Sequence, residues 1–344
     1  MAPSFDVLIG GAGLAGASSA RALARAGYRV LLVDRHTVAS GASGSGSGMV
    51  NPMMSRKGRP VWQVREALQQ LNPPPGGLLR PARTQEQADY FLDSATKNED
   101  LAEWIGPKDA LELYPYLAAP YGLILAKHGF GTNMGDLCRE WIGNVPVMES
   151  CSVHDWTEHA EYVAVHLSNG ETIDCKRLLL ATGLDLVHHP KTNHLYLHPI
   201  KGQRLQIRRP ASLPSEIMPL SGFGYVVDEG DTLGIGSTFE HSWTESGPTE
   251  AGAQEILDHA RTMLPGLGDP EIVTHTASIR VTIPGTRLPM VGPLPESDRV
   301  WFFTGLGSKG ILMSAYLGSR IPDFFNDLEA IPAGCRVATR KDKA

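Results

Sequence analysis

The stretch FDVLIGGAGLAG at residues 5–16 decides the fold. Its first five residues form a short, largely apolar run that is typical of a buried strand. The rest places three glycines, Gly11, Gly13 and Gly16, in the spacing G-x-G-x-x-G. In a dinucleotide-binding turn the first glycine permits the tight turn, and the second lets a pyrophosphate approach the backbone. The third allows the helix to pack closely on the strand.

The residues that follow supply the context that this fingerprint needs. Residues 14–26 are rich in Ala, Leu and Arg and predict a helix that ends at Gly27. Residues 28–33 predict a second strand, which ends at Asp34. The helix N-terminus offers N–H groups and a positive dipole to phosphate, and Asp34 can accept hydrogen bonds from a ribose diol. We therefore predict a Rossmann-like α/β domain. A glycine turn that binds nothing is the alternative.

Composition and charge exclude several classes of protein. The 344 residues are 42% hydrophobic and 20% charged, which is ordinary for a globular protein of about two domains. The formal net charge of −6 argues against non-specific nucleic-acid binding. Four cysteines without a C-x-x-C pair indicate a reducing compartment, and no apolar run is long enough to span a membrane. A strand predicted from residue 5 leaves no room for a signal peptide, so we expect a cytoplasmic protein.

Two more glycine-containing junctions follow predicted strands. Residues 178–183, LLLATG, predict a buried strand that ends in Ala-Thr-Gly, as in flavoproteins where the chain passes the adenine half of the cofactor. Residues 300–304 predict a strand, residues 305–310 a glycine turn, and residues from Ile311 a helix. The N-terminus of that helix suits the flavin pyrimidine, where it would stabilise the negative charge that builds up on reduction. An NAD dehydrogenase has no need of this second site, so the pattern favours FAD.

The remaining patterns predict an inserted second domain. They indicate helices at 60–71, 84–105 and 249–264, a hairpin at 162–167 and 171–181, and an antiparallel sheet at 195–245. We expect a discontinuous FAD-binding domain at 1–55, 129–190 and 278–335, a substrate domain at 56–128 and 191–277, and a tail at 336–344. Residues 40–48, SGASGSGSG, are compatible with a flexible linker or with a loop that lines a ligand. Their position directly after the dinucleotide unit favours the loop.

The sequence resembles the D-amino-acid oxidase/glycine oxidase family of FAD-dependent oxidoreductases. Within it, the chain is most similar to the FAD-dependent C-terminal domain of the bifunctional tRNA 5-methylaminomethyl-2-thiouridine biosynthesis enzyme. The matching stretches run in the family's order along nearly the whole chain: 41–44, 48–52, 129–137, 199–203, 234–240, Arg280, 287–292 and 305–310. Lys201 and Lys309 stand where the tRNA enzyme usually has arginine, so bidentate geometry is lost there. That enzyme's methyltransferase domain is expected to be absent, because flavoprotein sequence begins at residue 5.

The resemblance also implies site residues. Arg280 would bind a substrate carboxylate, and Lys309 is the second catalytic candidate. A planar guanidinium suits a carboxylate that must be held with its Cα–H facing flavin N5. A surface or ion-paired role is the alternative for Arg280. The expected cofactor-binding residues are Gly11, Gly13, Leu14, Ala15, Gly16, Asp34, Arg35, Ala42, Ser43, Gly44, Gly48, Met49, Val153, Ala181, Thr182, Gly183, Gly305, Leu306, Gly307, Ser308, Lys309, Gly310 and Ile311.

Neither a general base nor a metal is predicted. In this class the neutral amine loses a hydride to the flavin, so the cofactor carries the difficult step. His188, His189, His194 and His198 lie close in sequence, but their spacing matches no helical metal motif and prolines interrupt it. Cys335 lies far from any flavin-attachment position of the family. We therefore expect non-covalent FAD.

The predicted function is FAD-dependent oxidation of the C–N bond of a small amino acid or N-substituted glycine, giving an imine that is then hydrolysed. One alternative is oxidative removal of a carboxymethyl group from a modified wobble uridine in tRNA. Another is a flavin-binding protein without turnover. The run of Lys201, Arg204, Arg208 and Arg209 has two interpretations, a phosphate contact or a solvated basic face. The expected partner is a small-molecule amine, with tRNA as the alternative and no membrane.

Overall fold

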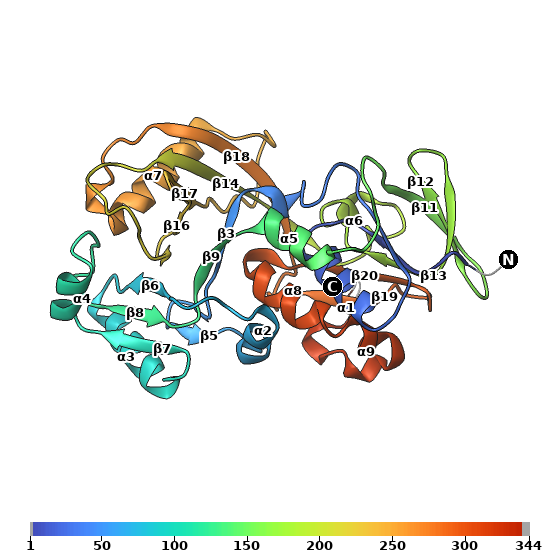
Figure 1. Ribbon diagram of the computed structural model, residues 1–344, viewed down its shortest axis with the longest axis horizontal. Helices are drawn as coiled ribbons and strands as arrows, with labels where there is room; N and C mark the ends of the chain where they lie inside the picture. The colour runs from blue at the N-terminus through green and yellow to red at the C-terminus, as the bar shows by residue number, and fades with distance from the viewer. Residues whose placement is uncertain (1–2, 339–344) are drawn as a thin grey trace. The chain divides into compact units, whose positions relative to one another are not determined.

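The computed structural model describes residues 3–338, and the chain divides into two units (Figure 1). The first unit comprises the residues up to Ser45, Met134–Ile200 and the residues from Ile279 onward, and the second comprises Gly46–Asn133 and Lys201–Ser278. Compared with the domain limits expected from the sequence, residues 46–55, residues 129–133 and Ser278 belong to the second unit, and residues 191–200 belong to the first. Of the expected tail, residues 339–344 lie outside the described residues.

The first unit is built on an eight-stranded sheet with the order β10-β2-β1-β13-β12-β11, in which β20 also pairs with β13 and β19 with β20. The strands are β1 (Phe5–Gly10), β2 (Val30–Val33), β10 (Val147–Met148), β11 (Val153–Glu158), β12 (Val163–Leu167), β13 (Thr172–Leu180), β19 (Met290–Pro293) and β20 (Val300–Thr304). Neighbours β10, β2, β1, β13 and β20 run parallel. The strands and the hairpin predicted for this unit are confirmed. Its parallel strands are apolar runs because both faces of such a sheet are covered.

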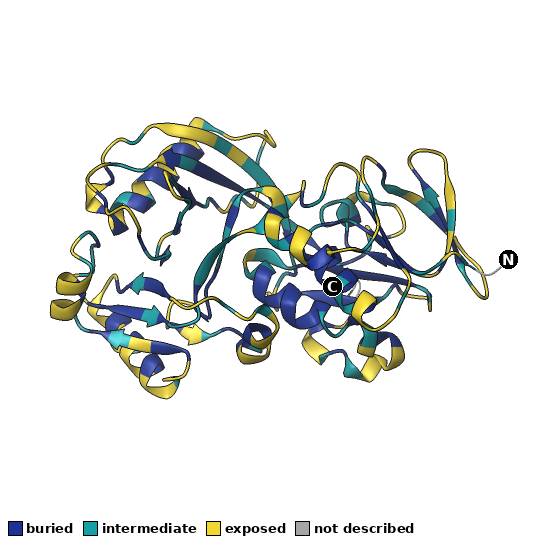
Figure 2. Cartoon of the chain, in the orientation of Figure 1, coloured by how far each residue is buried: buried dark blue, intermediate teal, exposed yellow. Residues whose placement is uncertain are grey.

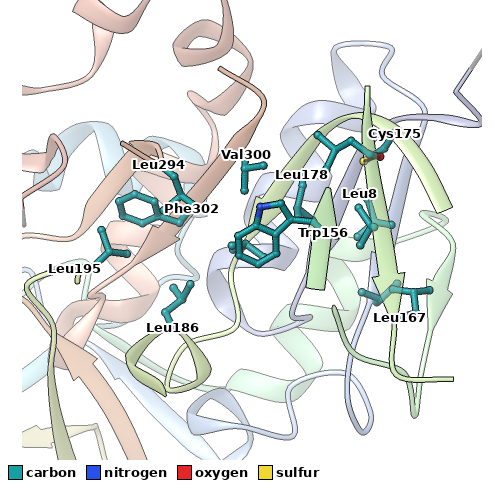
Figure 3. Close-up of a cluster of buried hydrophobic side chains, with 14 of the residues drawn as sticks. Leu8, Trp156, Leu167, Cys175, Leu178, Leu186, Leu195, Leu294, Val300 and Phe302 are labelled. Atoms are coloured by element: carbon teal, nitrogen blue, oxygen red, sulfur yellow. Dashed lines mark hydrogen bonds between the residues drawn. The ribbon is translucent and has the colours of Figure 1, made fainter. Parts of the chain in front are cut away.

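Helices and an apolar core cover this sheet. Helix α1 (Leu14–Arg25) packs against α5 (Met134–Ile142), α8 (Gly310–Gly318) and α9 (Ile321–Asn326). Every residue of α8 after Gly310 is buried, which follows from its sequence ILMSAYLG (Figure 2). A cluster that includes Leu8, Leu178 and Phe302 draws side chains from three adjacent parallel strands (Figure 3). A short helix, α6 (Asp185–His188), follows β13.

The second unit contains another eight-stranded sheet, with the order β18-β14-β17-β16-β15-β6-β8-β7. Its strands are β6 (Leu78–Pro81), β7 (Ala102–Ile105), β8 (Leu123–Ala126), β14 (His198–Arg208), β15 (Leu220–Ser221), β16 (Tyr225–Asp228), β17 (Thr232–Gly236) and β18 (Ile272–Thr282). The unit also contains two two-stranded sheets. In one, β3 (Ser47–Val50) pairs with β9 (Phe130–Asn133); in the other, β4 (Met53–Met54) pairs with β5 (Arg59–Pro60). The helices are α2 (Val64–Leu71), α3 (Gln85–Lys97), α4 (Pro107–Leu113) and α7 (Glu250–Met263). The sheet is mainly antiparallel, as expected, although β15 and β6 pair in parallel.

The helix predicted over residues 84–105 is wrong in its second half. Thr84 caps α3 by accepting a hydrogen bond from the amide of Gln87, at 3.2 Å, and the helix stops at Lys97. Asn98 then takes a non-helical conformation, and its carbonyl accepts from Leu101 in a turn. Strand β7 follows directly. Its sequence, AEWI, contains Trp104 and Ile105, and aromatic and β-branched residues favour sheets, so it suits a strand beside β8 better than a helix end.

Candidate active site

Three glycine-containing turns of the first unit lie along one edge of its sheet. Strands β1, β13 and β20 are parallel neighbours, with Gly10 opposite Leu180 and Leu180 opposite Phe302. Their carboxyl ends therefore meet at the same edge, where each strand runs into its turn. The amide of Ala181 donates to the carbonyl of Gly10, at 2.7 Å, which ties the first turn to the second. In open α/β sheets, ligands bind at this carboxyl edge.

The three fingerprint glycines are required for different reasons. Gly11 has a φ of +98°, and a Cβ there would lie 2.5 Å from the carbonyl oxygen of Ala181. A Cβ on Gly16 would lie 1.8 Å from the carbonyl oxygen of Gly11, so Gly16 is needed for the helix to approach the strand. Gly13 has an ordinary φ of −81°. Among the described residues, its Cβ would meet only Ser43 within 4 Å, with the hydroxyl oxygen 3.0 Å away. Packing of the protein alone therefore leaves the space at Gly13 open for a ligand.

Asp34 ties the end of β2 to this turn. Its Oδ2 accepts from the amide of Ala12, at 2.8 Å, and its Oδ1 accepts from the amide of His36, at 3.0 Å. The carboxylate is half-buried. Since a carboxylate offers about four lone-pair positions, Asp34 can accept further hydrogen bonds from a ribose. The next residue, Arg35, forms an ion pair with Asp185, which follows the turn after β13.

The N-terminus of α1 has the features that a pyrophosphate requires. The first four N–H groups of a helix have no partner within the helix, and its dipole places positive charge there. Ser43 accepts a hydrogen bond from the amide of Leu14, at 3.1 Å, and it lies in a short 3-10 turn at Ala42–Gly44. The open space at Gly13 lies beside these groups. The residues present therefore fit the diphosphate of FAD.

The turn at residues 305–310 lies next to the strand that carries Arg280. Thr282 and Leu306 form an antiparallel bridge. The hydroxyl oxygen of Thr282 is 3.4 Å from the Cβ position of Gly307, so the Thr282 side chain faces the turn. Arg280 precedes Thr282 by two residues on β18, and alternate residues of a strand share one face. Arg280 is therefore on the face of β18 that looks toward the glycine turn.

Lys309 is held by the main chain of a neighbouring loop. Its Nζ donates to the carbonyl oxygen of Arg287, at 3.1 Å. Burial lowers the pKa of Lys309 from its ordinary value, and the charge of Arg287 lowers it further. Arg287 itself is exposed and has a φ of +53°. Lys309 thus joins this loop to the start of α8.

The remaining predicted cofactor residues divide between the two units. In the first unit, Val153 begins β11, and its Cγ2 would lie 3.0 Å from a Cβ on Gly10. Gly48 and Met49 lie on β3 in the second unit, paired with Thr132 and Gly131 of β9. The flavin-loop assignment of these residues stays a prediction. Sequence reasoning missed Asp185 and Thr282, because no motif marks them. Each is distinguished only by its contact with a distant segment, Asp185 with Arg35 and Thr282 with Leu306.

The basic run at residues 201–209 has a different role from either predicted one. Lys201 is 1% exposed, and its Nζ lies 3.1 Å from Oε2 of Glu240. Arg204 pairs with Glu229 and Arg209 with Asp228, and both guanidiniums are largely buried. Arg208 is exposed and pairs with Glu271, at 3.4 Å. Carboxylates of neighbouring strands and loops neutralise three of the four cations. These three therefore do not form a solvated basic face, and they are not available to bind phosphate.

Within residues 3–338, the structure contains no group of three or more His, Cys, Asp or Glu side chains that could hold a metal ion. All four cysteines are buried free thiols, and burial raises the pKa of Cys138, Cys175 and Cys335 to about 12. Over the same residues, no helix combines the length and apolar character needed to cross a membrane.

The chain is similar to a family model and to curated proteins that include a glycine oxidase and a bifunctional tRNA biosynthesis protein. A family model described as FAD dependent oxidoreductase (DAO) matches residues 6–321. Glycine oxidase of Pseudomonas aeruginosa is 28% identical, over 95% of this chain and 96% of that protein. The tRNA 5-methylaminomethyl-2-thiouridine biosynthesis bifunctional protein MnmC of Burkholderia orbicola is 30% identical over 84% of this chain. This chain covers only 49% of that protein's length.

Solved structures share the fold over nearly the full chain. Glycine oxidase from Geobacillus kaustophilus has a TM-score of 0.77 at 22% identity, and the match covers 93% of this chain and 94% of that one. Iminodiacetate oxidase from Chelativorans sp. BNC1 has a TM-score of 0.76 at 21% identity, covering 95% and 96%. At these identities the likeness establishes the two-domain α/β architecture.

Proposed function

Since this chain belongs to the FAD dependent oxidoreductase family and is an FAD enzyme that acts on C–N donors, we propose that its substrate is a small amino acid or an N-substituted glycine. The amine is oxidised to an imine, and water then hydrolyses the imine to an oxo acid and an amine or ammonia. The FAD is held without a covalent bond.

The observation that carries this proposal is the bridge between Thr282 and Leu306. It sets the strand of Arg280 beside the turn at residues 305–310, which the proposal assigns to the flavin pyrimidine. A guanidinium on that face can bind a carboxylate through two parallel hydrogen bonds. Such a clamp fixes the position of the substrate Cα, and fixing a reacting atom can remove several kcal/mol from a barrier.

Each part of the first unit has a role in this scheme. The N-terminus of α1 and the open space at Gly13 hold the pyrophosphate, and Asp34 holds the ribose. When bound, FAD supplies the acceptor for the hydride of the substrate C–H. The N-terminus of α8 stabilises negative charge near the pyrimidine. Lys309 adds a positive charge at the same place, and its bond to the Arg287 carbonyl keeps it there.

A tRNA substrate is the second candidate, because bifunctional tRNA enzymes resemble 84% of this chain at 30% identity. A carboxymethylaminomethyl group on uridine presents the same glycine-like unit as a free amino acid. Neutralisation of Lys201, Arg204 and Arg209 by carboxylates removes most of the basic run that could contact tRNA phosphates. The net charge of −6 also argues against binding of tRNA phosphates. We therefore favour the free small molecule.

Anaerobic flavin reduction tests the proposal. The FAD-loaded protein is mixed with glycine, sarcosine, iminodiacetate or D-amino acids, and separately with tRNA that carries carboxymethylaminomethyl-uridine. Bleaching of flavin absorbance by a free amine is the expected result, with only weak dependence on salt. Conversion of tRNA without turnover of any free amine, with a rate that falls steeply as salt rises, would replace the first candidate by the second. A flavin that neither the free amines nor the tRNA reduce would leave only the non-catalytic role.

A further inference from the structure

A cavity of about 660 Å³ lies at the amino ends of β1 and β2 in the first unit. Phe5 and Val30, which begin these strands, line it together with the last turns of α1 and α5. The first glycine turn follows the carboxyl end of β1, and Asp34 follows the carboxyl end of β2. The cavity is therefore at the opposite edge of the sheet from the proposed FAD site, and its size is within the range of small-molecule sites, roughly 300–1,000 Å³.

The charges that line this cavity are unbalanced. Three arginines, Arg21, Arg25 and Arg29, face a single carboxylate, that of Glu140. Arg29 is neutralised by Asp6, at 3.1 Å. Arg21 and Arg25 form no ion pair within the described part of the chain. They are four residues apart on α1, so they project from one face of the helix.

Arg21 is the more informative of the two cations. Arg25 is exposed and sits in the last turn of α1, where a positive charge complements the helix dipole. Arg21 lies before that turn and is half-buried, so this explanation does not extend to it. Burial lowers the pKa of Arg21 and Arg25 lowers it further, against an opposing effect of Glu140. Glu140 forms no direct ion pair with Arg21, so the partly buried charge is only partly compensated, and an anion in the cavity would reduce the remaining cost.

Aromatic residues are among those that line the cavity. Phe5 and Tyr28 are half-buried, whereas Trp141 beside them is only 4% exposed. Half-buried aromatic residues suit contact with a planar apolar body. We propose that this cavity binds a small aromatic anion, whose carboxylate or phosphate contacts Arg21 and Arg25 while its ring lies against these aromatic side chains. This site is separate from the proposed amine site and does not depend on it.

Calorimetric titration of the FAD-loaded protein tests the proposal. The probes are 2-naphthoate, 2-naphthyl phosphate and the uncharged 2-naphthamide. We expect saturable one-to-one binding of at least one anion, and Arg21→Gln should weaken it about tenfold or more, since a charge-assisted hydrogen bond is lost. Arg65→Gln is the matched control, because Arg65 is an exposed, ion-paired arginine of the second unit. Arg280→Gln distinguishes this cavity from the amine site and should leave the titration unchanged.

The two anions separate the sources of the negative charge. Binding of the phosphate that weakens as pH falls below about 6 indicates a dianion, whereas pH-independent binding of naphthoate over the same range indicates a carboxylate. Either result supports the site. Absence of saturable binding by both anions, equal binding of the amide, or wild-type affinity in Arg21→Gln would each overturn it. Unchanged FAD absorbance and thermal midpoint show that the variant is folded.

Discussion

The bridge between Thr282 and Leu306 joins β18 to the turn that begins α8. It is made by main-chain groups, so a side-chain change at Arg280 leaves it in place. Because Thr282 faces Gly307, the bridge also fixes which face of β18 looks toward the turn. The proposed binding of substrate at Arg280 and the proposed binding of flavin at the turn can therefore be tested separately.

Replacing Arg280 with Gln should weaken substrate binding and leave FAD bound. Losing one charge-assisted interaction costs about 1.5–3 kcal/mol, which lowers kcat/KM about 10- to 150-fold for an amino-acid substrate. FAD affinity is measured by flavin fluorescence and should not change. Arg287→Gln is the matched control, because Lys309 binds the main-chain carbonyl of Arg287 and keeps that contact. If Arg287→Gln shows the loss and Arg280→Gln does not, the carboxylate site is at Arg287.

Gly13→Ala and Gly16→Ala should fail in different ways. A Cβ at Gly13 meets only the Ser43 side chain, so the variant should fold while its FAD affinity falls sharply. A Cβ at Gly16 overlaps the carbonyl oxygen of Gly11, so that variant should lose its fold. Circular dichroism and the absorbance of bound flavin distinguish the outcomes. A yellow Gly13→Ala protein with wild-type affinity would argue against pyrophosphate binding at this position.

The ion pair between Arg35 and Asp185 should contribute modestly to FAD retention. It joins the residue after Asp34 to α6, which follows the turn at Ala181–Gly183. Both side chains are partly exposed, so removing the pair should cost about 1 kcal/mol or less. We expect Asp185→Asn to raise the Kd of FAD up to about fivefold at low salt and to have less effect at high salt. Asp93→Asn, which breaks an exposed pair with Lys97, is the control. Equal Kd values for the wild type and Asp185→Asn would remove the pair from the cofactor site.

The glycine turns could be predicted from the sequence, because their backbone requirements depend only on residues close together in the chain. Gly11 needs a positive φ and Gly16 needs close approach, and both demands appear in the spacing alone. The strand–turn–helix order around residues 300–311 was predictable for the same reason. The end of α3 was not, because the helical composition continues beyond Asn98 and strand pairing with β8 overrides it.

The ion-pair partners of residues that are distant in sequence could not be predicted from the sequence. Arg35 and Asp185 are 150 residues apart. Lys201 lies on β14, whereas Glu240 follows β17. A run of basic residues looks the same whether it faces solvent or a row of carboxylates. For Arg280 the resemblance indicated the residue, and the position of the Thr282 side chain beside Gly307 indicates which face of β18 carries it.

Glu240 and Lys201 form the centre of a buried polar network in the second unit. Oε1 of Glu240 accepts from the Thr238 hydroxyl, at 2.6 Å, and from Nε2 of Gln203, at 2.8 Å. Burial alone would raise the pKa of Glu240, but hydrogen bonds from Thr238, Gln203 and Lys201 outweigh it and lower the pKa below its ordinary value. His275 contacts Oε1 of Gln203, at 2.9 Å, and burial, with a further effect of Lys201, lowers its pKa.

These shifts give the stability of the protein a definite dependence on pH. The lowered pKa of Glu240 contributes stability that is complete above its unfolded value of 4.5 and is lost as pH falls through the folded value. The unfolded chain protonates His275 near 6.5 while the folded chain resists it, so stability also falls below that pH. Both groups therefore lower the thermal midpoint as pH decreases from 7 to 4.

Glu240→Gln should lower the free energy of unfolding by about 3 kcal/mol at pH 7, because it leaves Lys201 buried without a counter-charge. Its thermal midpoint should also change less between pH 7 and 4 than that of the wild type. Glu271→Gln breaks the exposed pair with Arg208 in the same unit and should cost at most about 1 kcal/mol. Adding Lys201→Met to Glu240→Gln should recover part of the loss, since the unpaired charge is gone. A Glu240→Gln protein with the wild-type midpoint and pH slope would show that the network does not stabilise this unit.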